Sequence, residues 1–381
     1  MQYYLRHYFD PDFDYLHRKP VNLEADGDTD IYSLGYVQNV IAGQLLAEIV
    51  SLRDAGPNPN LKYILSSPTL PVGDNTHIDP AYPNYLISNI NGYVFYYRGR
   101  ITVKGLLNVR QDISFHTGNI FFVGDMAVHG SVRSGFSVQA NNVRIMGMVE
   151  GGVVRARRDL MVEGGARGGA GKHCLLDIGG KLLTPYVEKV EVRAKSNIVI
   201  DKYCLYSTVY AGANLVIKEQ MYGSTAHIFG SAYIGKQLGN RAGIPTKVFM
   251  GYDPLKLRQM ERLEVAISEL SQSITHLKAV AGHLPPDTNE TTKKLARQLE
   301  QREWLIERRS AILKILTHNE EHIHSCYLKV PGKIYPGVEI CIGQAFYTVE
   351  DQCENMMFRL VEDEILVEPI PIAEQKLKQA Q

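Results

Sequence analysis

Hydrophobic and polar residues alternate with a period of two through the middle of the chain, from about Gly92 to Gly235. Small or polar residues interrupt this alternation, and successive interruptions lie roughly 16 to 24 residues apart. Such alternation is typical of short β-strands, and Gly, Asn and Asp are favoured where the chain turns with positive φ. The interruptions include Thr117–Ile120, Arg133–Phe136, Arg158–Leu160, Gly179–Leu182, Lys195–Ile198 and Gly212–Leu215.

This spacing predicts a parallel β-helix, a solenoid in which each coil of two or three strands stacks on the next. One coil cannot bury its own apolar face, so neighbouring coils must supply the core. We therefore expect a mainly β fold in which residues 91–252 form a right-handed solenoid, beginning with strands at Tyr93–Tyr97 and Arg100–Val103. The side chains expected to face inward are Ile120, Val138, Leu160, Val162, Leu182, Val192, Ile198, Ile200, Leu215 and Ile217.

A helical period follows Tyr252. Asp253 can cap a helix, Pro254 suits its first turn, and apolar residues then recur at alternating steps of three and four. These residues are Met260, Leu263, Ile267, Leu270, Ile274, Leu277 and Ala281. A second helix is expected from about Thr291 to Ile323, with Leu295, Leu299, Ile306, Leu313, Leu316 and Ile323 on one stripe. Residues 253–324 are therefore predicted to form an antiparallel coiled-coil hairpin inserted into the β fold.

The flanking segments do not repeat. Residues 1–90 are expected to form a small mixed α+β domain, in which Asn39–Leu52 reads as an amphipathic helix. Residues 325–370 return to β patterning and are expected to stack on the open end of the solenoid as a cap. Residues 371–381 form a polar C-terminal tail.

Composition excludes several classes of protein. The 41 Lys and Arg balance the 41 Asp and Glu, so no overall charge attracts nucleic acid or an acidic membrane. The five scattered cysteines favour reduced thiols over a disulfide framework or a zinc site. The start of the chain lacks the pattern of a secretory signal, and no stretch has the roughly 18 apolar residues of a membrane helix. These features predict a cytoplasmic protein without a membrane span.

The glycine-rich run Gly164–His173 differs from a phosphate-binding loop. Ala166 stands where that loop needs its first glycine, and His173 stands where it needs a hydroxyl for magnesium. Asp26, Asp28 and Asp30 alternate like the start of a calcium loop, but the Gly and Glu that such a loop needs are missing. Both segments are interpreted as turns and loops.

Potential catalytic groups are scattered along the solenoid. Solenoid acyltransferases use a histidine base between coils, and carbohydrate-active β-helices gather acidic residues on one face. The residues of interest here are His116, His129, His173, His227, Asp112, Asp125, Asp159, Asp177 and Asp201. Because they are spread among the coils, we expect no catalytic residues, cofactor or metal. The alternative is a β-helix enzyme, either an acyltransferase or a carbohydrate-active protein.

Three segments resemble the flagellar assembly protein A family of bacteria. They are Gly92–Val103 at the start of the solenoid, the junction Val248–Pro254, and Lys333–Val338 after the coiled coil. The likeness extends over residues 85–350 and includes the order solenoid, hairpin, returning strands. The resemblance implies a polymer-forming or scaffolding β-helix in flagellar assembly or polar organisation, with protein partners and without known catalytic residues.

A second likeness is to the C-terminal β-helix of the Min-system cell-division inhibitor. That domain has an Arg-Ser-Gly-Gln turn, which Arg133, Ser134 and Gly135 match, whereas Phe136 replaces the glutamine. The resemblance implies these four residues as a candidate contact for a membrane-cycling P-loop ATPase.

The apolar seam of the first predicted helix also suggests self-association. Arg302 and Arg309 interrupt the stripe of its partner helix, so Ile267, Leu270 and Ile274 are expected to remain partly exposed. Contiguous exposed apolar surface usually marks a contact site, and a two-fold homodimer satisfies it most simply. The sequence therefore predicts a non-catalytic scaffold or interaction protein.

Overall fold

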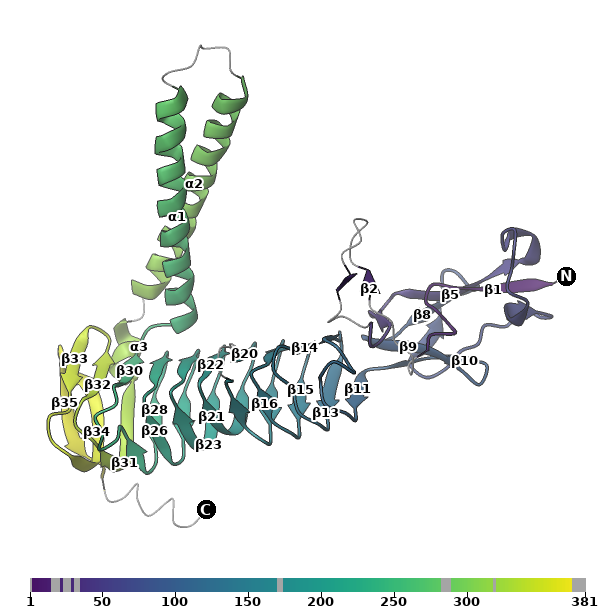
Figure 1. Cartoon of the computed structure of the whole chain (residues 1–381). Coiled ribbons are helices and arrows are strands. Elements are labelled where there is room, and N and C mark those ends of the chain that lie inside the picture. Colours follow the sequence, from purple (N-terminus) through teal and green to yellow (C-terminus); the bar gives the residue numbers. More distant parts are fainter. Residues whose placement is uncertain are drawn as a thin grey trace. The chain divides into compact units, whose positions relative to one another are not determined.

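The computed structural model describes residues 2–14, 21–22, 29–30, 35–169, 174–281, 289–317 and 320–371 (Figure 1). Contacts within the chain divide it into two compact units, Met1–Ala194 and Lys195–Gln381. The fold is mainly β, and a β-solenoid of about eight turns occupies residues 106–238.

The first unit begins with short antiparallel sheets. A five-stranded sheet has the order β6-β1-β5-β8-β7, and a three-stranded sheet has the order β10-β9-β4. Their bounds are β1 Tyr3–His7, β4 Asn39–Val40, β5 Leu45–Ser51, β6 Ile64–Leu65, β7 Thr76–Ile78, β8 Tyr85–Ser88, β9 Gly92–Tyr97 and β10 Arg100–Lys104. The strands β2 (Val21–Asn22) and β3 (Thr29–Asp30) pair with each other. Two 3-10 turns, η1 (Leu52–Asp54) and η2 (Leu61–Tyr63), complete this region.

The helix expected at residues 39–52 is wrong. The segment forms β4 and β5, separated by a turn in which Gly43 has a φ of 81°. Strand β5 lies between β1 and β8 in the sheet, and Leu46, Ala47 and Ile49 are buried there. A short apolar run is compatible with either a helix or a buried strand, so pairing on both edges decided the outcome.

The solenoid starts later than residue 91. Strands β9 and β10 pair antiparallel, joined by Arg98 and Gly99 with φ values of 50° and 76°. Two residues of positive φ make the turn of a β-hairpin, whose strands cannot be parallel coils of a solenoid. Apart from an isolated parallel bridge between Val72 and Ile101, parallel pairing between strands first appears between β11 (Leu106–Val109) and β13 (Asp125–Val128).

The coils of the first unit are built from parallel strands on two main faces. One face contains β11, β13, β15 (Val143–Ile145), β18 (Leu160–Val162) and β21 (Leu182–Glu188), with the short β16 (Val149–Glu150) and β19 (Ala166–Arg167). The other contains β12 (Ile120–Phe121), β14 (Ser137–Ala140), β17 (Val153–Ala156), β20 (Cys174–Ile178) and β22 (Val190–Ala194).

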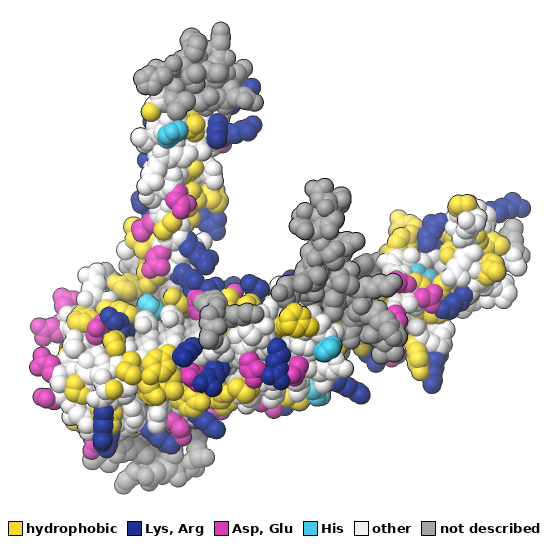
Figure 2. Space-filling view, in the orientation of Figure 1, with side chains coloured by type: hydrophobic (Ala, Val, Ile, Leu, Met, Phe, Trp, Pro, Cys, Tyr) yellow, Lys and Arg dark blue, Asp and Glu magenta, His cyan; other side chains and the backbone are white. Residues whose placement is uncertain are grey.

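The second unit continues the same pattern. One face contains β23 (Ile198–Leu205), β25 (Leu215–Ile217), β26 (Gln220–Tyr222), β28 (Ala232–Ile234) and β29 (Gln237–Leu238). The other contains β24 (Thr208–Ala211), β27 (Thr225–Ile228), β30 (Thr246–Met250), β32 (Val338–Ile342) and β33 (Ala345–Thr348). All ten side chains predicted to face inward along the solenoid are buried, which confirms its register. Figure 2 shows hydrophobic side chains that also remain on the outside of these coils.

The predicted hairpin is present. It consists of α1 (Pro254–Ala281) and α2 (Asn289–Thr317), followed by the short α3 (Glu320–Ser325). The Asp253 carboxylate accepts hydrogen bonds from the backbone N–H of Leu255 at 3.0 Å and of Lys256 at 3.2 Å, so it caps α1 as expected.

The second helix differs from the prediction in register. It was expected to run to Ile323; its described part, α2, runs to Thr317, residues 318–319 lie outside the described residues, and α3 continues to Ser325. Leu305 and Ile312 are buried against α1, whereas Leu313, which was placed on the inner stripe, is exposed. Helix α2 has apolar residues on adjacent stripes, and only packing against α1 selects between them.

The returning strands cap the second unit as predicted. Strand β31 (Tyr327–Ile334) pairs parallel with β28 and β29 and antiparallel with β34 (Cys353–Val361). Strand β35 (Glu364–Pro369) then pairs antiparallel with β34. The change from parallel to antiparallel pairing ends the stack. The polar tail lies outside the described residues from Ile372 onward.

Candidate interaction surfaces

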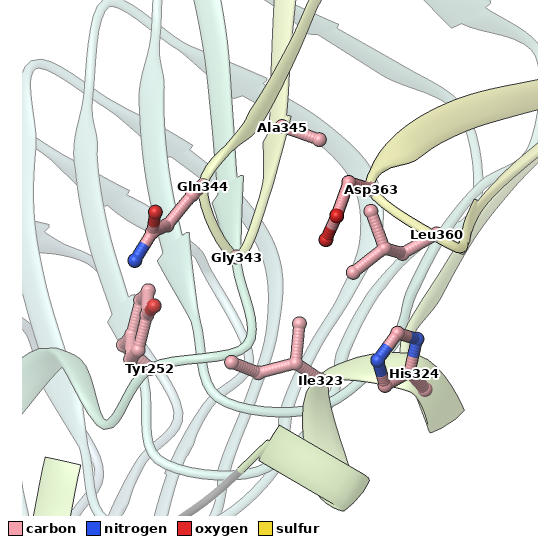
Figure 3. Close-up of a pocket in the computed structure, with 8 residues that line it drawn as sticks. All are labelled: Tyr252, Ile323, His324, Gly343, Gln344, Ala345, Leu360 and Asp363. Atoms are coloured by element: carbon pink, nitrogen blue, oxygen red, sulfur yellow. The ribbon is translucent and has the colours of Figure 1, made fainter. Parts of the chain in front are cut away.

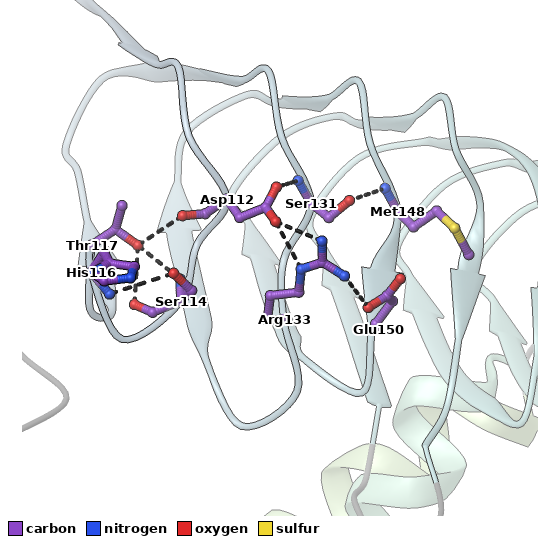
Figure 4. Close-up of polar contacts among 8 residues, drawn as sticks. All are labelled: Asp112, Ser114, His116, Thr117, Ser131, Arg133, Met148 and Glu150. Carbon is purple, nitrogen blue, oxygen red and sulfur yellow. Dashed lines mark hydrogen bonds and ion pairs between the residues drawn. The ribbon is translucent and has the colours of Figure 1, made fainter.

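The turn at Arg133–Phe136 is held by its neighbouring coils. The Arg133 guanidinium contacts the carboxylates of Asp112 and Glu150, each at 2.6 Å, so it connects three successive coils (Figure 4). Asp112 also accepts a hydrogen bond from the backbone N–H of Ser131 at 2.7 Å. That hydrogen bond, together with the Arg133 guanidinium, lowers the pKa of the Asp112 carboxyl.

Only part of this turn is available to a partner. Phe136 is buried, and its ring meets the Phe115 ring edge-on at 4.9 Å between centroids. Gly135 has a φ of 86°, and Ser134 and Gly135 are exposed. Ser134 lies at the edge of an open hollow of about 430 Å³ that is also lined by Met148, Glu150, Arg167, Gly168, Gly169 and Lys189.

The scattered acidic residues of the solenoid pair with basic residues about one coil away. In the first unit, Arg144 contacts Glu163 at 2.7 Å and Arg167 contacts Glu188 at 3.2 Å. In the second unit, Lys218 contacts Asp201 at 2.7 Å and Lys236 contacts Glu219 at 2.6 Å. These pairs join neighbouring coils and do not bring acidic groups together in one cleft. Such pairs are typical of a structural surface, on which charged side chains hold neighbouring coils in register.

The candidate histidines are also dispersed. The ring of His227 stacks between Tyr210 at 5.1 Å and Phe249 at 4.9 Å, and burial lowers the pKa of its imidazole. The Arg258 guanidinium of α1 lies 5.2 Å from the Tyr210 ring centroid, so this aromatic ladder meets the base of the hairpin. His116 is exposed on a turn, and His173 lies outside the described residues.

The buried thiols are not poised as nucleophiles. Burial raises the pKa of Cys174 to about 11, of Cys204 to about 12 and of Cys326 to about 11. A thiol with such a pKa carries almost no thiolate at neutral pH. Across the described part of the chain, no three His, Cys, Asp or Glu side chains are arranged to hold a metal ion.

A cavity of about 440 Å³ lies where α3 meets the C-terminal cap (Figure 3). Ile323, Leu360 and Ala345 contribute apolar surface, while His324 and Asp363 contribute polar groups at its rim. Gly343 also lines the cavity, and a Cβ at this position would lie 2.8 Å from the Ile323 side chain. Sequence patterning did not indicate this cavity, because segments far apart in the chain form it.

The seam on α1 that was expected to remain partly exposed is covered only in part. Ile274 is buried, and Ile267 and Leu270 are partly buried where they pack with the hairpin core. Partial exposure therefore persists at Ile267 and Leu270, whereas Ile274 is closed off within the hairpin. The large apolar side chains that α1 and α2 expose are others: Val265, Trp304, Leu313 and Ile315.

A family model described as the Flagellar Assembly Protein A beta solenoid domain matches residues 106–365, which is more than half of the chain. The chain belongs to this family. The match begins at residue 106, where β11 begins the parallel strand pairing, and it includes the helical hairpin and most of the capping strands. The resemblance to the flagellar assembly protein A family is thus confirmed, whereas the likeness to the Min-system inhibitor is not supported.

No curated protein and no solved structure matches the chain. Within the described residues, no helix is long and apolar enough to cross a membrane. Membership of the flagellar assembly protein A family supports a role related to flagellar assembly.

Proposed function

We propose that this chain is a non-catalytic scaffold in flagellar assembly. The solenoid provides a rigid surface, and the hairpin is a docking arm for protein partners. The family match is the observation that carries the proposal. The pairing of charged side chains between coils supports it, because these groups align the stack and do not converge on a substrate.

The proposal is tested by deleting the gene in a flagellated bacterium that carries it and counting flagella by electron microscopy. We expect fewer or misplaced flagella, restored by the full-length chain. A variant in which a Gly/Ser linker replaces residues 259–317 should accumulate normally but fail to restore them. Unchanged flagella in the deletion strain would overturn the proposal. A fluorescent fusion in the same strain tests the proposed cytoplasmic and polar location.

The alternative of a β-helix enzyme makes a different prediction. An enzyme needs converging acid, base or nucleophilic groups. For the scaffold, the exchanges His116→Ala, His129→Ala and His227→Gln should each restore flagella when the protein level is unchanged. Loss of complementation by one of these folded variants would favour catalysis.

The turn at Arg133–Phe136 remains the proposed contact for a membrane-cycling P-loop ATPase. Because Arg133 and Phe136 are engaged within the chain, a partner would have to reach Ser134 and Gly135. Ser134→Arg should therefore abolish co-purification of such an ATPase, whereas Ser137→Arg on the next strand serves as the control. Equal recovery with both variants would remove this turn from the proposal.

A further inference from the structure

Helix α2 has a second apolar stripe besides the one that packs on α1. Trp304, Arg308, Ala311 and Ile315 follow one another at steps of four, three and four residues, which is a heptad pattern on one side of a helix. Trp304 is 53% exposed and Ile315 is 46% exposed. The stripe facing α1 is separate and consists of the buried residues Leu305, Ile312 and Leu316. One helix thus presents two seams, and the hairpin itself covers one of them.

Trp304 and Arg308 have the character of an interface anchor. The Arg308 guanidinium lies over the Trp304 ring, 5.2 Å from its centroid, so the two side chains form a cation–π contact on the helix surface. Trp and Arg are the residue types most enriched among the side chains that dominate binding energy in protein interfaces. Half of the Trp304 surface nevertheless faces solvent.

The charged residues beside the stripe favour a second copy of α2 in antiparallel orientation as its partner. In the heptad frame, Glu307 and Lys314 occupy equivalent positions on the same edge of the stripe, one heptad apart. Two antiparallel copies of α2 would place Trp304 opposite Ile315 of the second copy and Glu307 near its Lys314. A parallel arrangement would instead place Arg308 at the same level as the second Arg308, where the two charges repel.

We propose that α2 packs antiparallel against α2 of a second copy of this chain through the stripe Trp304–Ile315, forming a two-fold dimer. The arrangement is self-complementary, as a two-fold interface requires. It buries the exposed apolar side chains and pairs Glu307 with Lys314 twice. This inference deepens the proposed scaffolding role by naming a second copy as one partner of the hairpin.

The test uses the purified full-length chain and two matched variants. Ile315→Glu places a charge in the stripe, whereas Leu313→Glu changes a residue of similar exposure, 48%, on the other side of α2. Sedimentation velocity over a dilution series should show a dimer of the 42.7 kDa chain. Ile315→Glu should raise the dissociation constant at least tenfold, about 1.4 kcal/mol, and Leu313→Glu should leave it nearly unchanged.

Trp304 provides an independent readout, because it is the only tryptophan of the chain. Its fluorescence should shift to longer wavelength as the wild-type protein is diluted and the ring becomes exposed. In Ile315→Glu the emission should already be that of an exposed ring at high concentration. Circular dichroism of each variant checks that the hairpin is still folded.

Charge exchange tests the antiparallel register on surface residues that should not disturb folding. Glu307→Lys and Lys314→Glu should each weaken the dimer, and the double variant should restore it. A wild-type monomer at every concentration would overturn the proposal, as would equal dimer loss in Leu313→Glu and Ile315→Glu. Failure of the double exchange to rescue would overturn the antiparallel register. If a monomeric variant still supports normal flagella, the dimer is not needed for flagellar assembly, but the α2 stripe remains the dimer interface.

Discussion

At the scale of single residues, successive side chains along each solenoid strand alternate between the buried core and the outer surface. Ile198 and Ile200 are fully buried, while Val199 between them points outward and stacks in register with Val216 of the following coil. Glycines allow close contact between coils: a Cβ on Gly235 would lie 2.0 Å from the Lys218 carbonyl oxygen. Alternation decides which side chains enter the core, and glycine at the turns lets the backbones of neighbouring coils approach each other.

A charge at an inward position should therefore unfold the stack. We expect Ile198→Asp to lower the free energy of unfolding by about 3 kcal/mol or more, because a carboxylate without a partner would be buried. Thermal melts followed by circular dichroism measure the loss. Val199→Asp is the matched control and should cost much less, since its side chain reaches solvent. Equal melting temperatures for both variants would contradict the observed register.

At the scale of elements, the N-terminal sheet contains a partly buried imidazole among aromatic rings. His7 on β1 lies among the rings of Phe9, Tyr63 and Tyr96, with centroid distances of 5.4, 4.5 and 5.5 Å. Burial lowers the pKa of His7 to about 4 from an ordinary value of 6.5. Nearby Asp12 opposes this shift and Lys62 adds to it. The folded sheet thus favours the neutral ring.

Stability of this sheet should consequently depend on pH. Between pH 6.5 and about 4, the unfolded chain binds a proton at His7 that the folded chain does not. The contribution of neutral His7 is therefore complete above pH 6.5 and decreases as the pH falls through that window. We expect His7→Phe to melt closer to its pH 7.5 temperature at pH 5 than the wild type does. An identical pH dependence in both proteins would show that His7 does not titrate as described.

The hairpin should be separable from the solenoid, provided that the cut leaves its base intact. His322 of α3 stacks on Phe229 at 4.0 Å, and Ile323 packs near Gly251 and Gly343, so these residues belong to the solenoid end. Replacing residues 259–317 with a Gly/Ser linker should preserve a folded, β-rich protein with a similar melting temperature. Extending the replacement through Ile323 should lower that temperature, because the α3 contacts are lost. Insolubility of the shorter replacement would show that the hairpin helices are part of the core.

At the scale of the whole molecule, each unit contains contacts that cover an end strand of its parallel stack. In the first unit, the Asn39 side chain donates to the Phe121 carbonyl at 2.9 Å and accepts from the Val123 N–H at 3.1 Å. It therefore occupies backbone groups beside β12, where a further strand could otherwise pair. In the second unit, antiparallel β34 and β35 follow β31. Edge strands without such cover are templates for association with other chains.

Removing the cover of β12 should promote association between solenoids. We expect Asn39→Ala to form larger species than the wild type at the same concentration, measured by light scattering at high salt and low protein. Asn89→Ala, in the same region but away from β12, is the control. Removal of residues 1–104 should have a stronger effect, because the whole N-terminal region is lost. A truncated chain with the same size distribution as the full-length protein would contradict this role.

The sequence by itself determined the features that repeat locally. Alternation of period two identified the ten inward-facing residues, and steps of three and four identified α1 and its Asp253 cap, because these periods follow from strand and helix geometry alone. Tertiary structure decided between conformations that the local sequence pattern does not distinguish. Pairing with β1 and β8 made Leu45–Ser51 a strand. Packing on α1 buried Leu305 and Ile312 and left their neighbours more exposed. The hairpin turn at Arg98-Gly99 makes β9 and β10 antiparallel, so the parallel solenoid begins only at residue 106. In each case several conformations satisfy the local sequence, and only contacts with distant segments give one of them the lower free energy.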